Sequence, residues 1–428
     1  MRELLRNPRM RLYLTGQLFS LFGDTMLFLA MGIWVKTLTG SSAAAGLTFL
    51  FLAAPALLAP LAGMVVDRVR RRSLLIGANL ALALTVLPLL LVSDASRVWL
   101  VYTVMVGYGT GRLLISSGQA ALLPTLVPEE KLGHANSALS LIQNGMRLIS
   151  PLAGAGLFAA SGAHTVVLID VATFLIATAT LLAIRVAEPR PAPRVGSWRD
   201  EVSGGARFIR ATPELRQLVL ALVIGFAVVG LIETVSFAVV AALGRPPAFL
   251  GVLVSVQGVG AVLAGVSAPR LMRRVGEGRL AAGGLLVSAT GIASLAVPIT
   301  AVDLAGMAVL GAGITAVAIG TNTSLQRRTP TQLLGRVDAA AEVTITVPQT
   351  VFIGVGAALV ATVNYQLLIG ATTALMLGSG IWLLTRQSQP SATASAPLTS
   401  GDGRPGRGSR SRIHARPDRA GPADPAGQ

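Results

Sequence analysis

Long apolar segments, separated by short polar ones, follow one another along most of the chain. A segment of about 20 apolar residues is long enough for a helix to cross the hydrocarbon core of a bilayer. Twelve such segments are present: 12–35, 43–64, 73–93, 97–119, 134–160, 164–185, 215–243, 248–268, 279–299, 302–323, 337–362 and 364–385. The pattern predicts an all-α membrane protein with twelve transmembrane helices.

The amino-acid composition supports the same conclusion, because it also indicates that most of the chain lies in lipid rather than in water. Hydrophobic residues make up 53% of the 428 residues and charged residues only 13%. The mean hydropathy is +0.68. A soluble domain has about 25% charged residues, so this chain has too few of them to cover a surface in water.

The basic residues have a strongly uneven distribution. The net charge is +16. If the N-terminus is cytoplasmic, the loops expected outside hold only Lys36, Arg97 and Arg245, while Arg112 and Arg147 lie within apolar segments. An excess of positive charge in the remaining loops is typical of the cytoplasmic side. We therefore expect a multi-pass plasma membrane protein with both termini in the cytoplasm. The basic loops then face anionic lipid head groups rather than nucleic acid.

Two segments interrupt the membrane pattern and divide the chain. We predict an N-terminal six-helix bundle over 1–185, a cytoplasmic linker over 186–214, a C-terminal six-helix bundle over 215–386, and a disordered basic cytoplasmic tail over 387–428. Within the linker, Trp198 to Arg210 is expected to form a short amphipathic helix on the membrane surface.

The two halves share motifs at one fixed spacing. The matching pairs, each 202 residues apart, are Gly63 and Gly265, Arg68 and Arg270, Arg71 and Arg273, Arg72 and Arg274, Pro128 and Pro330, Leu132 and Leu334, and Gly133 and Gly335. Six helices, a linker and six equivalent helices indicate two parallel repeats, related by a pseudo-twofold axis along the membrane normal.

These features resemble the major facilitator superfamily over roughly residues 8–386. The motif G-x-x-x-D-R-x-x-R-R runs from Gly63 to Arg72 between the second and third segments. Residues 123–137 (LPTLVPEEKLGHANS), Ser150-Pro151 and Leu21-Phe-Gly-Asp24 are similar to the branch that holds macrolide efflux proteins and the enterobactin exporter. The chain departs from the family at Arg70, where glycine is expected, and at Pro269, where an acid is expected. The antiporter motif of the fifth helix is only partial.

The resemblance implies a cytoplasmic gate built from Gly63, Asp67, Arg68, Arg71 and Arg72. Asp67 is expected to pair with nearby basic groups and with the N-terminus of the eleventh helix. The helix macrodipole favours a carboxylate at such a position by under about 1 kcal/mol, which suits a contact that must break in every cycle. The alternative is that the arginines only determine topology.

Two acids lie at matching depths in the two halves. Asp24 is halfway along the first segment, and Glu233 is near the middle of the seventh. A charge at the bilayer centre costs at least ~2.5 kcal/mol, so such a group is a candidate for reversible proton binding. The resemblance places both helices beside a central cavity, where either acid would bind protons or a cationic substrate. A structural acid bonded to a neighbouring helix is the alternative for Asp24.

Arg147 and Arg112 are expected to be buried cations that need counterions. We expect Asp24 or Glu233 to pair with Arg147, and Asp67 to pair with Arg112. Purely structural pairing is the alternative for both arginines.

Other residues at depth are candidates for contact with a solute. We predict that Gln17, Gln143, Asn144 and Gln257 line the cavity, with hydrogen bonding between helices as the alternative for each. Phe28 and Phe237 are among the aromatic residues on the first and seventh segments that can stack on a large apolar substrate; packing or lipid contact is their alternative. Asp170 is expected nearer the outer face, in an interfacial position.

No signature of an enzyme, metal site or cofactor site is present in the sequence. The chain has no cysteine, and its three histidines, His134, His164 and His414, have no metal-ligand spacing. Walker, G-x-S-x-G and H-E-x-x-H motifs are also absent. We therefore expect no catalysis and no cofactor. Without an ATP site, transport must draw on a gradient of ions or substrate.

Together these features predict a secondary active transporter. The resemblance implies proton-coupled efflux of hydrophobic drug-like or natural-product molecules by alternating access. The expected partners are a small-molecule substrate, protons and membrane lipids, with no nucleic acid, and the chain is expected to act as a monomer. The alternatives are a siderophore exporter or solute importer of the same fold, and a membrane sensor or scaffold that does not transport.

Overall fold

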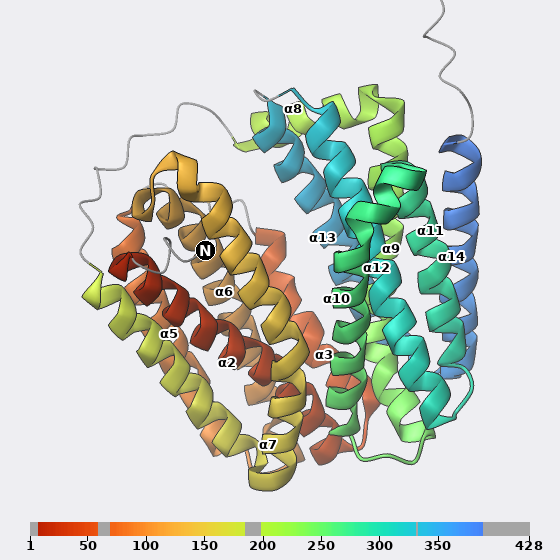
Figure 1. Cartoon of the computed structure of the whole chain (residues 1–428). Helices are drawn as coiled ribbons and strands as arrows, with labels where there is room; N and C mark the ends of the chain where they lie inside the picture. The colour runs from red at the N-terminus through yellow and green to blue at the C-terminus, as the bar shows by residue number, and fades with distance from the viewer. Residues whose placement is uncertain (1–6, 59–68, 185–197, 331–332, 388–428) are drawn as a thin grey trace, which may run out of the picture. The chain divides into compact units, whose positions relative to one another are not determined.

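Helices make up nearly all of the computed structural model, which describes residues 7–58, 69–184, 198–330 and 333–387 (Figure 1). The α-helices are α2 (Pro8–Thr39), α3 (Ser42–Ala53), α5 (Arg71–Val86), α6 (Val98–Leu126), α7 (Leu132–Ala183), α8 (Trp198–Ala211), α9 (Pro213–Ala242), α10 (Phe249–Val275), α11 (Glu277–Ser294), α12 (Thr300–Arg328), α13 (Leu334–Leu359) and α14 (Tyr365–Gln387). Short 3-10 helices are η1 (Ala54–Leu58), η2 (Leu87–Leu91), η3 (Ala95–Arg97) and η4 (Glu129–Lys131). All described residues belong to one compact unit.

The helices match the predicted transmembrane segments over the described residues; of the second segment, 43–64, the described part ends at Leu58. Within the described ranges, nine helices are long and apolar enough to cross a membrane, and α3 with η1 forms a shorter apolar helix. The 18-residue α11 supplies the ninth predicted segment. The 52-residue α7 contains the fifth and sixth, which are joined at Gly162, where φ is 77°. Only glycine adopts this left-handed backbone readily, so Gly162 lets the chain reverse. The prediction of an all-α membrane fold is confirmed.

The two halves pack in the same order, as the internal repeat predicts. In the first half, α2 packs against α7, α5 against α6 and α7, and α3 against α6. In the second half, α9 packs against α13 and α14, α11 against α12 and α14, and α10 against α12. Since α9 is the counterpart of α2, and α13 and α14 are the counterparts of the two parts of α7, the predicted pair of six-helix bundles is confirmed.

Each half has its own apolar core. Tyr108 and Phe174 are among the fully buried side chains of the first core, and Leu285 and Ile369 of the second. The second core also includes Phe49 of α3, so the halves share apolar contacts. Lipid tails are as apolar as these side chains, and the helices therefore associate through close packing at small residues. At Gly109, for example, an added Cβ would overlap the carbonyl of Leu52.

The main contacts between the halves are those of α7 with α10, α3 with α13 and α3 with α9. On α10, a Cβ at Gly251 would lie 2.8 Å from the carbonyl oxygen of Pro151 and would overlap Ala155. On α3, a Cβ at Gly46 would lie 3.3 Å from Ala357 of α13. These contacts lie near the beginnings of α3 and α10, the side that the charge pattern predicts to face outward.

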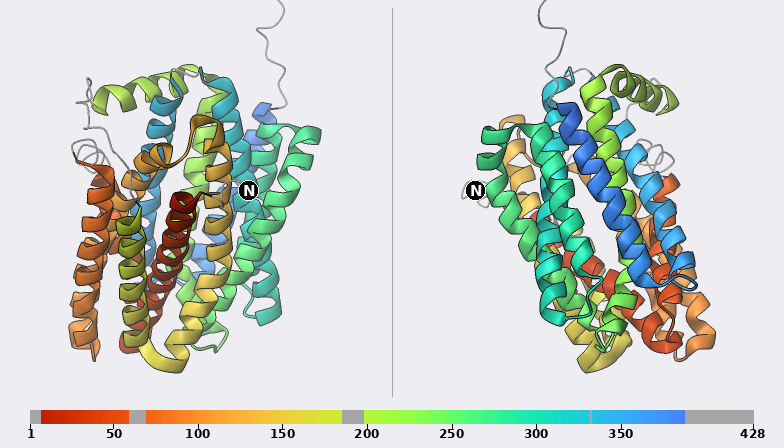
Figure 2. Two further views of the ribbon diagram at one scale, coloured as in Figure 1. Left: turned by 60° about the vertical axis from the view of Figure 1, so that its left-hand side comes forward. Right: turned by 90° about the vertical axis from the view of Figure 1, so that its right-hand side faces the viewer.

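The linker helix α8 belongs to the second half by its contacts. It packs against α13 and α9 and lies crosswise to the long helices (Figure 2). Gly205 lies against the backbone of Arg336, and Ile209 shares an apolar cluster with Val337. The predicted helix from Trp198 to Arg210 is therefore confirmed, while its place on the membrane surface stays a prediction.

Candidate functional site

A pocket lies where α2 and α3 of the first half face α9 to α12 of the second. Its volume is about 80 Å³, room for several water molecules. It is lined by Phe28, Leu29, Phe49, Val229, Ile232, Glu233, Ser236, Leu250, Val254, Gln257, Ile292, Met307, Leu310 and Ile314. Most of these side chains are apolar, so the few polar ones decide how a bound solute is oriented.

Glu233 and Gln257 are the polar residues of this pocket that can reach a solute. Both are partly exposed. Ser236, the third polar residue, donates its hydroxyl to the carbonyl oxygen of Ile232 on its own helix, at 2.6 Å. The structure thus brings together two residues that the sequence predicts for the cavity, a carboxyl group from α9 and an amide from α10.

An aromatic wall crosses the contact between the halves. The ring centroids of Phe28 and Phe49 are 4.6 Å apart, and those of Phe49 and Phe237 are 5.8 Å apart in a stacked arrangement. Phe28 and Phe49 come from the first half and Phe237 from the second. Phe49 was not predicted, because one phenylalanine in an apolar segment carries no pattern of its own.

Asp24 lies in the interior of the first half and is not among the residues that line the pocket. It is 7% exposed. The hydroxyl of Tyr108 on α6 donates a 2.6 Å hydrogen bond to its Oδ1. Arg112 on α6 and Asp170 on α7 interact with it electrostatically. Arg147 was expected to pair with Asp24 or Glu233, but the cation that acts on Asp24 is Arg112. Arg112 was expected to pair with Asp67, which lies outside the described residues.

Asp170 is the functional candidate that sequence reasoning missed. The sequence predicts an interfacial position, yet its side chain is fully buried beside Asp24. The sequence did not predict on which face of α7 Asp170 lies. In the structure it lies on the face that packs against α2, where Gly23 leaves room for its carboxyl group. An acid within an apolar segment was the available signal.

The predicted polar group on the first part of α7 is exposed. Gln143, Asn144 and Arg147 all have exposed side chains. The prediction of a buried Arg147 is wrong, because it is the backbone carbonyl of Arg147 that lies against Gly258 of α10. These residues are not among those that line the pocket beside Glu233, and their role in a cavity stays a prediction.

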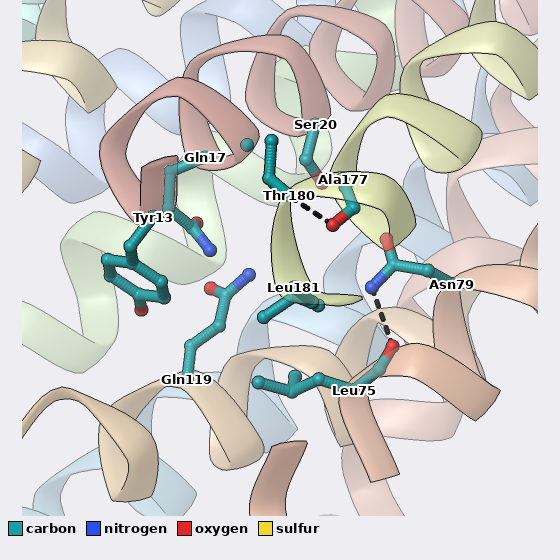
Figure 3. Close-up of a pocket in the computed structure, with 10 residues that line it drawn as sticks. Tyr13, Gln17, Ser20, Leu75, Asn79, Gln119, Ala177, Thr180 and Leu181 are labelled. Atoms are coloured by element: carbon teal, nitrogen blue, oxygen red, sulfur yellow. Dashed lines mark hydrogen bonds between the residues drawn. The ribbon is translucent and has the colours of Figure 1, made fainter. Parts of the chain in front are cut away.

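Gln17 lines a second, much smaller pocket inside the first half (Figure 3). This pocket measures about 10 Å³, the space of one water molecule. The amides of Gln17 and Gln119 point towards one another in it (Figure 3). Gln17 therefore lies in a cavity of one bundle rather than beside Glu233.

The predicted gate is only partly described. Gly63, Asp67 and Arg68 lie outside the described residues. Arg71 begins α5, and Arg72 donates from its guanidinium group to the carbonyl oxygens of Leu181 and Leu182, at 2.8 and 2.9 Å. These bonds tie the start of α5 to the end of α7. The gate itself stays a prediction.

Comparison with known families decides the identity of the fold. The family model described as the Major Facilitator Superfamily matches residues 13–352. The chain belongs to the major facilitator superfamily. It thus has the multi-pass membrane fold of a transporter family, with the two bundles that its repeat and its contacts show.

Relatives of this transporter agree with the resemblance to macrolide efflux proteins. Macrolide efflux protein A of Streptococcus pyogenes is 28% identical over 227 residues, which are 51% of this chain and 56% of that protein. The chain thus spans about half the length of these relatives. An uncharacterized MFS-type transporter of Mycobacterium tuberculosis is 30% identical over 355 residues, covering 76% of this chain and 77% of that protein.

Solved structures support the fold alone. A bacterial homologue of the iron transporter ferroportin, in its inward-facing state, has a TM-score of 0.69 at 19% identity and covers 90% of this transporter and 100% of that chain. The nucleoside transporter NupG has a TM-score of 0.72 at 12% identity, with 89% and 99% covered.

Proposed function

We propose that this transporter exports hydrophobic drug-like or natural-product molecules in exchange for protons. The observation that carries the proposal is the pocket at the contact of the halves, where Glu233 and Gln257 interrupt an apolar and aromatic wall. Apolar walls with a few polar groups are typical of sites for small organic ligands. A carboxyl group in such a wall favours ligands with a basic amine. The likeness to proteins named for macrolide efflux supports the same class of substrate.

The size of the pocket supports alternating access. Pockets for drug-sized ligands measure about 300–1,000 Å³, whereas this one measures about 80 Å³. The halves must therefore separate to admit such a molecule. Their close contacts at Gly251 and Gly46 lie at the end predicted to face outward, so a rocking motion that opens these contacts would expose the pocket to the other side.

A minimal exchange cycle uses the two acids within the membrane-spanning helices α2 and α9. A proton that enters from outside binds at Asp24 or Glu233, and its binding favours release of the substrate outward. The acid then loses the proton to the cytoplasm and the pocket accepts new substrate. In this proposal the chain works as a monomer in the plasma membrane, with both termini cytoplasmic and with lipids around its apolar helices.

The test is exchange by the purified full-length chain in liposomes. Erythromycin, a basic macrolide, is the probe, and a proton gradient is the driving force. We expect Glu233→Gln to lower transport by roughly tenfold or more, because contacts with a charged group contribute about 1.5–3 kcal/mol. The matched control is Glu214→Gln, which alters an acid on the same helix at its first turn and should transport like wild type.

Two results would count against the proposal. Transport by Glu233→Gln at the wild-type rate would remove the substrate role of this pocket. A wild-type protein that moves no erythromycin under any gradient would exclude macrolides as substrates. Counterflow with siderophores and small polar solutes would then test the alternative functions, siderophore export and solute import.

A further inference from the structure

Asp170 is buried in a way that calls for an explanation. Its side chain is 0% exposed, and neither carboxyl oxygen has a well-formed hydrogen bond in the described structure, although the Tyr108 hydroxyl lies near it. A Cβ at Gly23 of α2 would lie 2.6 Å from its Oδ1, so this acid occupies the space that glycine leaves. A polar group buried without partners is costly, and a charged one more so.

The charges around Asp170 do not balance if both nearby acids are ionised. Among the described residues, the charged or titratable groups that act on it are Asp24 on α2 and Arg112 and Tyr108 on α6. One arginine thus faces two carboxyl groups. Two buried carboxylates repel one another, and such pairs commonly share one proton. Two carboxyl groups beside one arginine are therefore suited to hold a single shared proton.

A line of polar side chains leads away from this pair inside the same bundle. Tyr13, Gln17, Ser20 and Asp24 are spaced by four, three and four residues along α2, which places them on one helical face. The first three line the small pocket, together with Asn79 of α5. Ser20 lines the small pocket and lies one helical turn from Asp24. The pocket and the two acids are therefore neighbours along α2.

The small pocket suits a water molecule. Asn79 is buried and donates to the carbonyl oxygen of Leu75 at 2.7 Å, while its own Oδ1 has no partner in the described structure. Thr180 and Gln119 supply further polar groups around the same space (Figure 3). A water needs a polar site about the size of one probe sphere with two to four partners, and this pocket meets both conditions.

We propose that Asp24 and Asp170 form a proton-sharing pair inside the N-terminal half, from which the polar line of α2 leads to the end where that helix begins. Arg112 balances one of the two carboxyl charges, and the shared proton balances the other. This inference rests on the proposed proton coupling and deepens it: the proton binds within one bundle, while the substrate binds at Glu233 on the contact between the halves. Asp24 and Asp170 never need to touch the substrate.

Infrared spectroscopy of the purified full-length chain tests the pair without any substrate. The C=O stretch of protonated carboxyl groups is followed while the pH is changed from acidic to alkaline. A shared proton disappears when either acid is neutralised, because Arg112 then balances the remaining carboxylate. We therefore expect Asp170→Asn and Asp24→Asn to lose the same titrating band. Asp303→Asn removes another fully buried acid, in the C-terminal half, and should keep that band.

Two outcomes would overturn the pair: retention of every wild-type band by Asp170→Asn, or loss of different bands in the two variants. Because Asp24→Asn makes the same prediction independently, poor folding of one variant does not spare the proposal. Failure of erythromycin transport with the shared band intact would overturn the proposed function alone.

The path is tested separately by Asn79→Leu, which keeps a similar volume and removes the polar group. We expect the shared band to persist, and its isotope shift in heavy water to develop more slowly by roughly tenfold, a barrier change of about 1.4 kcal/mol. The control is Thr178→Val, a buried polar residue of α7 that does not line the small pocket. Wild-type exchange in Asn79→Leu would overturn the path.

Discussion

The hydroxyl of Tyr108 donates a 2.6 Å hydrogen bond to Oδ1 of Asp24, and both side chains are buried. The bond joins α6 to α2 in the interior of the first half. It holds one oxygen of the Asp24 carboxyl group in place against α6. This hydrogen bond therefore contributes to the stability of the first bundle and also holds the Asp24 carboxyl group in position.

Replacing Tyr108 by Phe should destabilise the protein. A buried acceptor that loses its donor costs about 1–3 kcal/mol, and hydrogen bonds within membranes lie at the lower end of this range. Thermal unfolding in detergent measures the effect. Tyr102→Phe is the control, since its hydroxyl donates at 3.0 Å to a backbone carbonyl and the residue is only half-buried. Equal losses in the two variants would show that Asp24 does not depend on Tyr108.

A side chain at Gly251 should keep the halves apart. A Cβ there overlaps Ala155 and lies 2.8 Å from the carbonyl oxygen of Pro151, so Gly251→Val prevents the close approach of α10 and α7. We expect erythromycin transport to be lost while the protein still folds. Gly283→Val introduces the same side chain where a Cβ meets nothing within 4 Å and should transport normally. Full activity of Gly251→Val would mean that this contact is not needed in the cycle.

Phe49 is the middle ring of the aromatic wall and contacts Phe28 of the first half and Phe237 of the second. Phe49→Ala removes the ring contacts with Phe28 and Phe237, each an interaction of about 0.5–1.5 kcal/mol beyond burial, and enlarges the pocket. Competition assays should show weaker inhibition by aromatic compounds than by aliphatic compounds of equal size. Phe51→Ala is the matched control, because this ring packs against Tyr102 at 5.0 Å instead. A uniform change for all competitors would contradict a direct role for Phe49.

Asp94 gives a prediction for acid pH. It lies outside the membrane spans, between η2 and η3, and hydrogen bonds from the Ser96 side chain, the Ser93 side chain and the Ser96 amide hold the pKa of its carboxyl group below the ordinary value. A lowered pKa stabilises the folded loop above the unfolded pKa of about 3.9. That stabilisation is lost as the pH falls through the folded pKa. Asp94→Ala should therefore speed amide exchange at Ser96 at neutral pH, and the difference should shrink in acid. A difference that grows on acidification would show the opposite sign.

The sequence was sufficient to predict the helices and their pairing into two halves, because hydropathy reports which segments lie in lipid and the repeat reports their symmetry. The resemblance placed the helix of Glu233 beside a central cavity, and Gln257 was one of the residues predicted to line it; both line the pocket at the contact between the halves. The position of a residue along its apolar segment was not enough to predict the burial of Asp170 or the exposure of Arg147. Each residue turns a helix by about 100°, so the face on which a side chain lies depends on packing against neighbours, which the hydropathy of a single segment does not report.

The small pocket illustrates the same limit. Gln17, Asn79 and Gln119 lie on three different helices, and no spacing in the sequence relates them. Their shared environment arises only when α2, α5 and α6 pack together.

Thiol accessibility at Ser236 tests most directly whether one pocket is exposed to each side of the membrane in turn. The chain has no cysteine, so Ser236→Cys carries a single reactive group in the pocket, and Ser288→Cys, buried on α11, is the control. We predict that a membrane-impermeant thiol reagent labels Ser236→Cys both in intact cells and in inside-out vesicles, and that erythromycin protects it from either side. Labelling from one side only under every gradient, or labelling that erythromycin leaves unchanged, would contradict the account.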